Sequence, residues 1–201
     1  MIRCLGAIVI ERDNMNLLII SGSRNPDGQT AQAAKALLRG VVDNGGQGEI
    51  VYLPQMSIDS CRQCEDSGWG LCIKEGRCVI EDDLSGLVEK IRGANAVAFA
   101  TPVYFSDLSE SMKAFLDRLR RICRHDVSKG AAAGRSAMGI CVAGGSGGGA
   151  PACCASLETA LLHCGFDMID MVPVKRQNLP LKEKVLESTG KWLVSGDNSS
   201  R

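Results

Sequence analysis

The chain has 201 residues, and its 23 basic and 23 acidic side chains leave a formal net charge of zero. That length allows one sizeable buried core, and the neutral balance excludes bulk charge as a reason to bind nucleic acid or an anionic membrane. Aromatic residues make up only 4%, which argues against stacking platforms for single-stranded nucleic acid. No apolar run approaches the roughly 20 residues of a membrane-spanning helix.

The N-terminal segment MIRCLGAIVIERDN contains a short apolar stretch that is followed by charged residues, without a small-residue cleavage pattern. We therefore predict that residues 1–15 are an unprocessed extension and not a signal peptide. The ten cysteines then indicate a reducing cytoplasm, where cysteine serves metal binding, redox chemistry or core packing. At the other end, residues 196–201 are predicted to be a disordered tail.

Apolar runs alternate with amphipathic segments along the chain. Strands are predicted at 16–20, 49–53, 96–100, 137–143 and 166–172. Helices are predicted at 30–44, 82–93, 108–119, 151–164 and 181–193. An irregular cysteine-rich insertion at 54–80 interrupts this order. Because aspartate accepts hydrogen bonds from free helix N–H groups, Asp82 or Asp83 is expected to cap the second helix.

The five strands are short, apolar and without alternation, which is typical of a parallel sheet with both faces covered. A helix follows each strand. The pattern predicts one α/β domain over residues 16–195, built on a doubly wound five-stranded parallel sheet in three layers.

A loop of hydroxyls and glycines joins the first strand to the first helix, in the stretch LLIISGSRNPDGQT. Ligands of doubly wound sheets bind at the carboxyl ends of the strands. Backbone N–H groups, the positive end of the helix and the hydroxyls of Ser21, Ser23 and Thr30 can all donate to phosphate oxygens. The alternative is an ordinary turn between strand and helix.

The same loop differs from the loop that binds nucleotide triphosphates. Five residues separate Gly22 from Gly28 where that motif has four, and Gln29 stands in place of its lysine. Without the lysine a triphosphate loses its main counter-charge. A singly esterified phosphate therefore suits the loop better.

The loop after the third strand, TPVYFSDLS, offers an apolar wall. Pro102 restricts the chain, and Tyr104 and Phe105 supply aromatic surface. A flat heteroaromatic ring could lie there with its polar edge on the backbone of residues 103–106. The alternative is that the two aromatic side chains plug the top of the sheet.

The loop after the fourth strand, AGGSGGGAP, allows the backbone to approach a ligand closely. Gly145, Gly147 and Ala150 also satisfy the weak dinucleotide-binding pattern, with Asp170 at about the expected distance. That pattern normally opens the first β-α-β unit, so we interpret the loop as a second wall of the same pocket. A non-redox dinucleotide-binding domain is kept as an alternative.

Together the three loops resemble those of the flavodoxin-fold, FMN-binding oxidoreductases: the NAD(P)H-dependent FMN and quinone reductases and the related iron–sulfur flavoproteins. The family's first loop, S-x-S-x-x-x-x-G-[NQ]-T, binds the FMN phosphate and is matched by Ser21, Ser23, Gly28, Gln29 and Thr30. The stretch TPVYFSDLSESMKAFLDR is close to the family's most distinctive block, whose start contacts the isoalloxazine ring. The family's glycine-rich third loop is matched at 144–149. The resemblance covers residues 16–172 and implies a flavodoxin-like fold.

This resemblance implies that FMN is the cofactor and that NAD(P)H is the co-substrate. Electrons would pass to a quinone, a free flavin or another small acceptor, without a side-chain nucleophile, because the flavin carries the chemistry. Homodimers or homotetramers are common in such folds. The cofactor-binding residues would be Ser21, Ser23, Arg24, Asp27, Gly28, Gln29, Thr30, Pro102, Val103, Tyr104, Phe105, Ser106, Gly144, Gly145, Ser146 and Gly147.

Four cysteines lie close together in CRQCEDSGWGLCIKEGRC, where Cys61, Cys64, Cys72 and Cys78 follow the spacing C-x2-C-x7-C-x5-C. Four thiolates in one loop can hold an iron–sulfur cluster or zinc. The iron–sulfur flavoproteins carry a tighter motif here, typically with two residues between the second and third cysteines. The alternatives are a [4Fe-4S] cluster, zinc, or free thiols and disulfides. With a cluster, the chain would be an electron carrier for ferredoxin-like partners.

The remaining features are given structural interpretations. Cys141, in a strand, and Cys164, at a helix end, are expected in the core. Cys153 and Cys154 lie at a helix start near the expected pocket. The basic run RLRRICR at 118–124 is interpreted as a solvated helix face, with binding of NADPH phosphate or of an acidic partner as alternatives.

Overall fold

The computed structural model describes residues 15–126 and 130–195, so the predicted tail and nearly all of the predicted extension lie outside the described residues. Its strands form one parallel sheet in the order β2-β1-β3-β4-β5. They are β1 (Asn16–Ser21), β2 (Gln47–Tyr52), β3 (Ala96–Pro102), β4 (Ser136–Ala143) and β5 (Asp167–Lys175).

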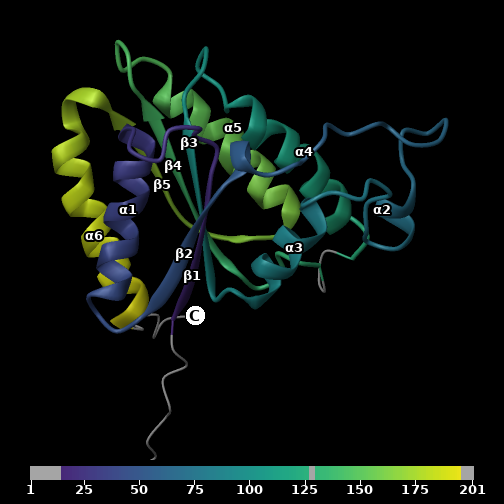
Figure 1. The fold of residues 1–201 in the computed structure, drawn as a ribbon, viewed down its shortest axis with the longest axis horizontal. Helices are drawn as coiled ribbons and strands as arrows, with labels where there is room; N and C mark the ends of the chain where they lie inside the picture. Colours follow the sequence, from purple (N-terminus) through teal and green to yellow (C-terminus); the bar gives the residue numbers. More distant parts are fainter. Residues whose placement is uncertain (1–14, 127–129, 196–201) are drawn as a thin grey trace, which may run out of the picture.

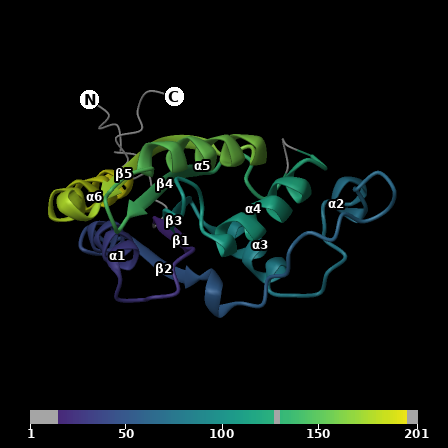
Figure 2. The same cartoon turned by 90° about the horizontal axis from the view of Figure 1, so that it is seen from above.

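Helices cover both faces of this sheet, with α1 and α6 on one side and α3, α4 and α5 on the other (Figure 1 and Figure 2). The helices are α1 (Gln29–Val42), α2 (Leu71–Lys74), α3 (Leu84–Gly93), α4 (Glu110–Cys123), α5 (Ala150–Cys164) and α6 (Leu179–Ser195), with short 3-10 turns at Leu53–Gln55 and Arg176–Asn178. The predicted three-layer, flavodoxin-like architecture is confirmed. No helix among the described residues is long and apolar enough to cross a membrane.

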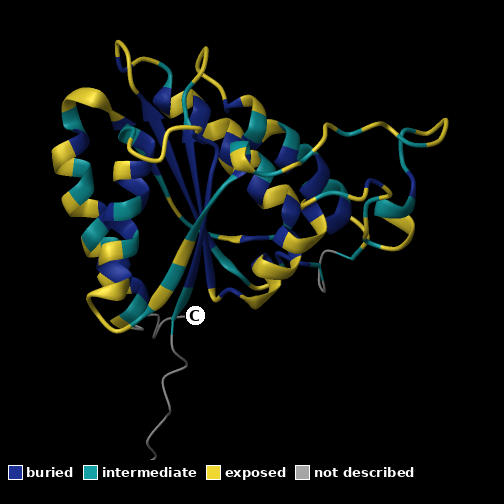
Figure 3. Ribbon diagram, in the orientation of Figure 1, coloured by how far each residue is buried: buried dark blue, intermediate teal, exposed yellow. Residues whose placement is uncertain are grey.

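The strand sequences are apolar without alternation because successive side chains enter two different cores. In β1, Leu17 and Ile19 pack toward α1 and α6, whereas Leu18 and Ile20 pack toward α3, α4 and α5. All four are buried. Figure 3 shows the same burial along the central strands.

Two glycines bring α1 and α6 into backbone contact. A Cβ atom on Gly40 of α1 would lie 2.1 Å from the carbonyl oxygen of Glu187, and one on Gly190 of α6 would lie 2.3 Å from that of Leu37. No side chain fits in this space, so the two helices could not approach as closely with any other residue at either position.

We expect Gly40→Ala to lower the free energy of unfolding by about 2 kcal/mol, because overpacking of the helix contact outweighs the better helix propensity of alanine. Gly86→Ala is the matched control, since Gly86 lies in α3 and a Cβ atom added there would meet nothing within 4 Å. There the propensity gain of up to about 1 kcal/mol should appear alone. Urea unfolding of both variants checks the pair, and equal effects would contradict the packing argument.

Candidate functional site

Three loops meet at the carboxyl edge of the sheet, where β1, β3 and β4 end side by side. The first loop joins β1 to α1, the second joins β3 to α4, and the third joins β4 to α5. In Figure 1 all three lie at the upper end of the strands. The strand order reverses between β1 and β3, which is the switch point where such sheets bind ligands.

The loops touch one another in pairs. The backbone N–H of Gly22 donates to the carbonyl oxygen of Ala100 over 2.8 Å, and Ser111 donates its hydroxyl to the carbonyl oxygen of Gly22 over 3.2 Å. A Cβ atom on Gly149 would lie 2.5 Å from the Ser106 Oγ, so the second and third loops also abut. The sequence-predicted loops are therefore brought together into one continuous rim.

The first loop presents buried hydroxyls beside an uncapped helix. Ser21, Ser23 and Thr30 are buried, and the backbone N–H of Ser23 donates to the Ser21 Oγ over 3.3 Å. Helix α1 begins after Gly28 with no side-chain cap and no acidic residue in its first turn. Such a helix start, with its partial positive charge, suits an anion.

Gln29 carries a buried acceptor that lacks a partner. Its Oε1 atom is buried and receives no hydrogen bond from any described residue. It lies 3.3 Å from where a Cβ on Gly144 would stand, between the first and third loops. A buried, unsatisfied acceptor costs about 1–3 kcal/mol, so a ligand with an O–H or N–H donor fits here. The ribityl hydroxyls and the ring N–H of FMN are donors of this kind.

The outer part of the first loop is exposed. Arg24 and Asp27 lie at the surface, and the Asp27 carboxylate is 3.3 Å from the Lys35 ammonium. This ion pair offsets the negative charge that Asp27 would otherwise place near a phosphate. Both residues thus lie at the rim of the candidate site and not on its buried floor.

The second loop holds its aromatic residues in a tight turn. Tyr104 and Asp107 exchange backbone hydrogen bonds of 2.9 Å, and the two residues between them, Phe105 and Ser106, have positive φ angles of 49° and 67°. Tyr104 is 56% exposed and Phe105 is 107% exposed. The alternative that these side chains plug the sheet is therefore wrong. A backbone held in this costly conformation, with apolar rings outside the core, favours contact with a ligand.

The third loop supplies backbone without side chains. Gly144, Gly145 and Ser146 are exposed, whereas Gly147 is buried and adopts a φ of +81°. Helix α5 follows directly. The loop lies beside both other loops, since a Cβ on Gly144 would lie 3.3 Å from the Gln29 Oε1 and one on Gly149 would lie 2.5 Å from the Ser106 Oγ.

The four clustered cysteines line one small cavity beside α4. Cys61, Cys64, Cys72 and Cys78 are half-buried free thiols around a space of about 20 Å³. That space holds about one water molecule, so a cluster would enter only if the loop moved outward. Within residues 15–126 and 130–195, no three His, Cys, Asp or Glu side chains are arranged to hold a metal ion as they stand. The four thiols are the kind of ligand that a cluster takes, but they are not arranged around a space large enough to hold one.

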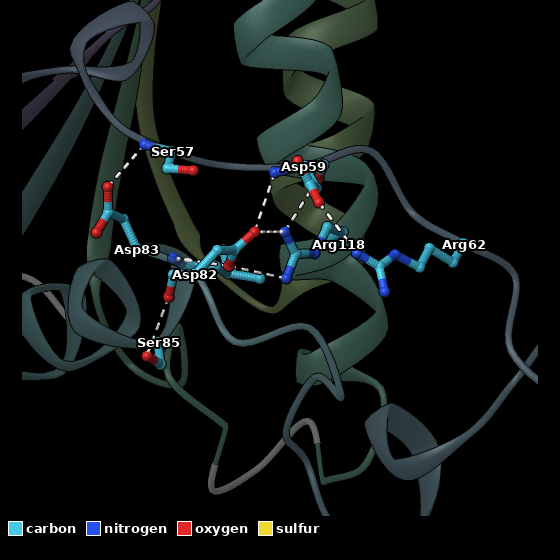
Figure 4. Close-up of polar contacts among 8 residues, drawn as sticks. Ser57, Asp59, Arg62, Asp82, Asp83, Ser85 and Arg118 are labelled. Carbon is cyan, nitrogen blue, oxygen red and sulfur yellow. Dashed lines mark hydrogen bonds and ion pairs between the residues drawn. The ribbon is translucent and has the colours of Figure 1, made fainter.

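Arg118 lines this cavity and forms a buried ion pair (Figure 4). Its side chain is 1% exposed and donates to both carboxylate oxygens of Asp82, one of them over 3.0 Å. A further 3.0 Å hydrogen bond reaches the carbonyl oxygen of Asp59. The prediction that the basic run is a solvated face is therefore wrong for Arg118, because the loop folds over this side of α4.

The same ion pair determines the ionisation of Asp82. Burial favours the neutral carboxyl, but hydrogen bonds from Arg118 and from the backbone N–H groups of Asp59 and Leu84 outweigh it, and the pKa of Asp82 lies below its ordinary value. The carboxylate is thus charged throughout the neutral range. It holds the two ends of the cysteine segment together.

Asp82 and Asp83 share the capping of helix α3. Asp83 is the residue that precedes α3, but its side chain accepts no hydrogen bond from the helix and instead accepts one from the Ser57 N–H. Asp82 accepts from the Leu84 N–H over 3.2 Å. The prediction of Asp82 or Asp83 is confirmed in two parts, since Asp83 occupies the N-cap position and the Asp82 carboxylate accepts the hydrogen bond from the first residue of the helix.

The other cysteines among the described residues lie in the core. Cys141 and Cys164 are fully buried, as predicted, and so is Cys153, while Cys154 is nearly so. The strand and helix-end positions of the first two indicated this burial. They take no part in the rim of loops or in the cavity beside α4.

Comparison with known proteins gives a consistent result. The sequence model of the family described as NADPH-dependent FMN reductase matches residues 15–184. An iron-sulfur flavoprotein of Methanocaldococcus jannaschii is 30% identical over 106 residues, which are 53% of this chain and 52% of that protein. A second iron-sulfur flavoprotein of the same organism is 27% identical over 161 residues, 80% of this chain and 75% of the other. The matched part thus spans about half the length of the first relative.

Solved structures are similar in fold. An NAD(P)H:quinone oxidoreductase from Methanothermobacter marburgensis superposes with a TM-score of 0.67 at 19% identity, covering 90% of this chain and 96% of that one. At this identity the likeness concerns the arrangement of strands and helices.

Proposed function

Because this chain belongs to the family of NADPH-dependent FMN reductases, we propose that it binds FMN at the rim of the three loops and transfers electrons from NAD(P)H to a small acceptor. The observation that carries the proposal is the buried, unpartnered Gln29 Oε1 beside buried hydroxyls at an uncapped helix start. FMN supplies the capacity to take up a hydride and pass its electrons onward.

The protein binds and orients the phosphate end through its first loop. The hydroxyls of Ser21, Ser23 and Thr30 and the N–H groups of the first turn of α1 donate to phosphate oxygens. Gln29 accepts from a donor of the ribityl chain or the ring. Arg24 and Asp27 border the phosphate from the exposed side, and Gly28 leaves room for it.

The ring end is held by the second and third loops. Pro102, Val103 and Ser106 offer backbone groups to the polar edge of the ring, while Tyr104 and Phe105 cover it and exclude water. Gly144, Gly145, Ser146 and Gly147 form the facing wall. The physiological acceptor is a quinone, a free flavin or a similarly flat molecule, and the active form is a homodimer or homotetramer.

A second function is favoured by the cavity beside α4. Four thiols converge there, and three arginines, Arg62, Arg118 and Arg121, also line the cavity. The thiols are suitable ligands for a [4Fe-4S] cluster after outward movement of the loop. The chain would then exchange single electrons with ferredoxin-like partners. The 30% identical iron-sulfur flavoprotein supports this alternative by its name.

The test is an anaerobic visible spectrum of the purified protein before and after addition of FMN, with iron, sulfide and zinc analysis. Flavin bands that bleach on addition of NAD(P)H are expected. A broad iron–sulfur shoulder with stoichiometric iron would favour the carrier, and its lack would favour the simple reductase. Failure to take up FMN would overturn the proposal and bring the dinucleotide-binding alternative forward.

A further inference from the structure

The cysteine segment is a hairpin-like excursion in which one arm leaves the sheet and the other returns to it (Figure 1). The outgoing arm carries Cys61 and Cys64, and the returning arm carries Cys72 and Cys78. All four are free thiols that line the same cavity beside α4. Because that cavity measures only about 20 Å³, the four side chains lie around a gap about one water molecule wide.

Polar contacts join the two arms at their base. The backbone N–H of Asp59 donates to the Asp82 carboxylate over 3.0 Å, and Arg118 donates to both residues. Cys61 follows shortly after Asp59 in the outgoing arm. Cys78 shortly precedes Asp82 in the returning arm. The contacts at the base therefore favour a pairing of Cys61 with Cys78.

A second set of contacts joins the arms toward the tip. The Lys74 ammonium forms an ion pair with the Glu65 carboxylate over 2.9 Å. Glu65 directly follows Cys64 in one arm, and Lys74 belongs to the same short helix as Cys72 in the other. A Cβ atom on Gly70 would lie 3.0 Å from the Cys64 Cβ, so the chain just before Cys72 passes close to Cys64. These contacts favour a pairing of Cys64 with Cys72.

A disulfide fits this arrangement, whereas a cluster does not. A cluster requires outward movement of the segment, which would break the 2.7 Å hydrogen bond from Arg121 to the Gly68 carbonyl oxygen. It would also draw the Trp69 ring away from the Arg121 guanidinium, which lies 4.5 Å from the ring centre. A disulfide requires the opposite movement, because its two sulfur atoms approach to about 2.05 Å and close the gap. The contacts with α4 can then stay in place.

Two arginines of α4 supply hydrogen-bond donors for sulfur chemistry at this cavity. The Nε atoms of Arg118 and Arg121 are buried and form no hydrogen bond with any described residue, and both side chains line the cavity. Thiol–disulfide exchange passes through sulfur anions, which accept hydrogen bonds from charged donors. Each arginine therefore leaves a donor for a sulfur anion that forms during exchange.

We propose that the cysteine segment is a dithiol–disulfide site, in which Cys61 pairs with Cys78 and Cys64 pairs with Cys72. The oxidant is a low-molecular-weight disulfide. One cysteine sulfur attacks it, which forms a mixed disulfide and releases a first small thiol. The second cysteine sulfur then attacks the first, which forms the bridge and releases a second small thiol. Each cysteine pair loses two electrons and two protons, and the two small thiols carry them away.

The first test equilibrates the full chain anaerobically with mixtures of reduced and oxidised glutathione, in the presence of a chelator. After the remaining thiols are blocked, mass spectrometry of peptides digested without reductant should show the 61–78 and 64–72 bridges. In Cys78→Ser, Cys61 should carry a glutathione adduct while the 64–72 bridge still forms. Cys154→Ala, which removes a thiol of the core, is the control and should leave both bridges. Free thiols at every ratio, adducts without bridges, or any other pairing in the segment would overturn the proposal.

The second test concerns the anchored tip. In Arg121→Met the tip loses its attachment to α4, so Cys64 and Cys72 are held together less and their effective concentration falls. We expect the equilibrium constant for their bridge to fall at least tenfold, which is about 30 mV for a two-electron couple, while the bridge at the base changes much less. Arg120→Met is the matched control, because Arg120 is 38% exposed in its side chain and does not line the cavity. Equal constants in Arg121→Met and the parent chain would overturn the role of the tip.

Iron and FMN separate this proposal from the functions proposed above. It competes with the second of them, because a sulfur atom in a disulfide is not a cluster ligand. After anaerobic incubation of the reduced chain with iron and sulfide, we expect all four thiols to remain open to alkylation. Stoichiometric iron that protects them would overturn the proposal and favour the cluster. FMN titration of the same preparation reports separately on the rim of loops, which contains none of these cysteines.

Discussion

Replacing Ser23 with alanine and Thr30 with valine in one variant is expected to weaken FMN binding more than about 100-fold, because each lost hydrogen bond to a charged phosphate is worth about 1.5–3 kcal/mol. Ser23 is buried in the first loop and Thr30 in the first turn of α1, so water replaces these hydroxyls poorly. Fluorescence titration of the apoprotein with FMN measures the change.

Thr189→Val is the control for this prediction. Thr189 is a half-buried threonine of α6, far from the three loops in the sequence, whose hydroxyl donates to the Val185 carbonyl oxygen within its own helix. Its removal should leave the affinity unchanged. If the double variant bound FMN as tightly as the parent chain, the phosphate would have to lie elsewhere, and the assignment of the first loop would be lost.

Arg118→Met should lower the free energy of unfolding by about 3–5 kcal/mol, because it leaves the Asp82 carboxylate buried without its counter-ion. For a domain of this size the melting temperature would fall by roughly 6–20 °C. Thermal unfolding followed by circular dichroism measures the shift. Lys113→Met removes a cation from an exposed pair with Asp117 and should cost no more than about 1 kcal/mol.

A double variant separates the ion pair from simple loss of packing. Arg118→Met combined with Asp82→Asn should cost much less than the sum of the two single changes, since the uncompensated charge is then gone. Additive costs would show that the charges are not coupled.

The stability that the Asp82–Arg118 ion pair contributes should also depend on pH in the acidic range. The folded-state pKa of Asp82 is depressed, so its contribution to stability is fully present above the unfolded-state value of about 3.9 and is lost as the pH falls through the lower folded-state value. The stability difference between the parent chain and Asp82→Asn should therefore shrink only below about pH 4.

The order of elements and the three loops could be predicted because each depends on local sequence. The buried run Leu17–Ile20 predicts a strand without knowledge of its neighbours, and the glycines at 144–149 predict a loop. Parallel pairing then brings the loops together, since the carboxyl ends of β1, β3 and β4 share one edge.

The surroundings of the cysteines could not be predicted in this way. Arg118 looks like any basic residue of a helix, and only the return of a segment more than 30 residues earlier in the chain buries it against Asp82. Likewise, both Asp82 and Asp83 satisfy the local capping rule, and the contact with Arg118 lies outside that rule. The one local signal was the spacing of Arg118 and Arg121 on one helix face, opposite an irregular loop.

Helix α4 connects the rim of the three loops with the cysteine segment at a fixed distance and a fixed rotation. It begins at Glu110, just behind the aromatic turn, and carries both arginines in its second half. From Glu110 to Arg118 the helix advances about 12 Å, and each residue turns it by about 100°. One inserted residue in this part of α4 would turn the guanidinium groups of Arg118 and Arg121 away from their partners in the cysteine segment, the Asp82 carboxylate and the Gly68 carbonyl oxygen. The length of this part of α4 therefore decides whether the cysteine segment can pack against the helix.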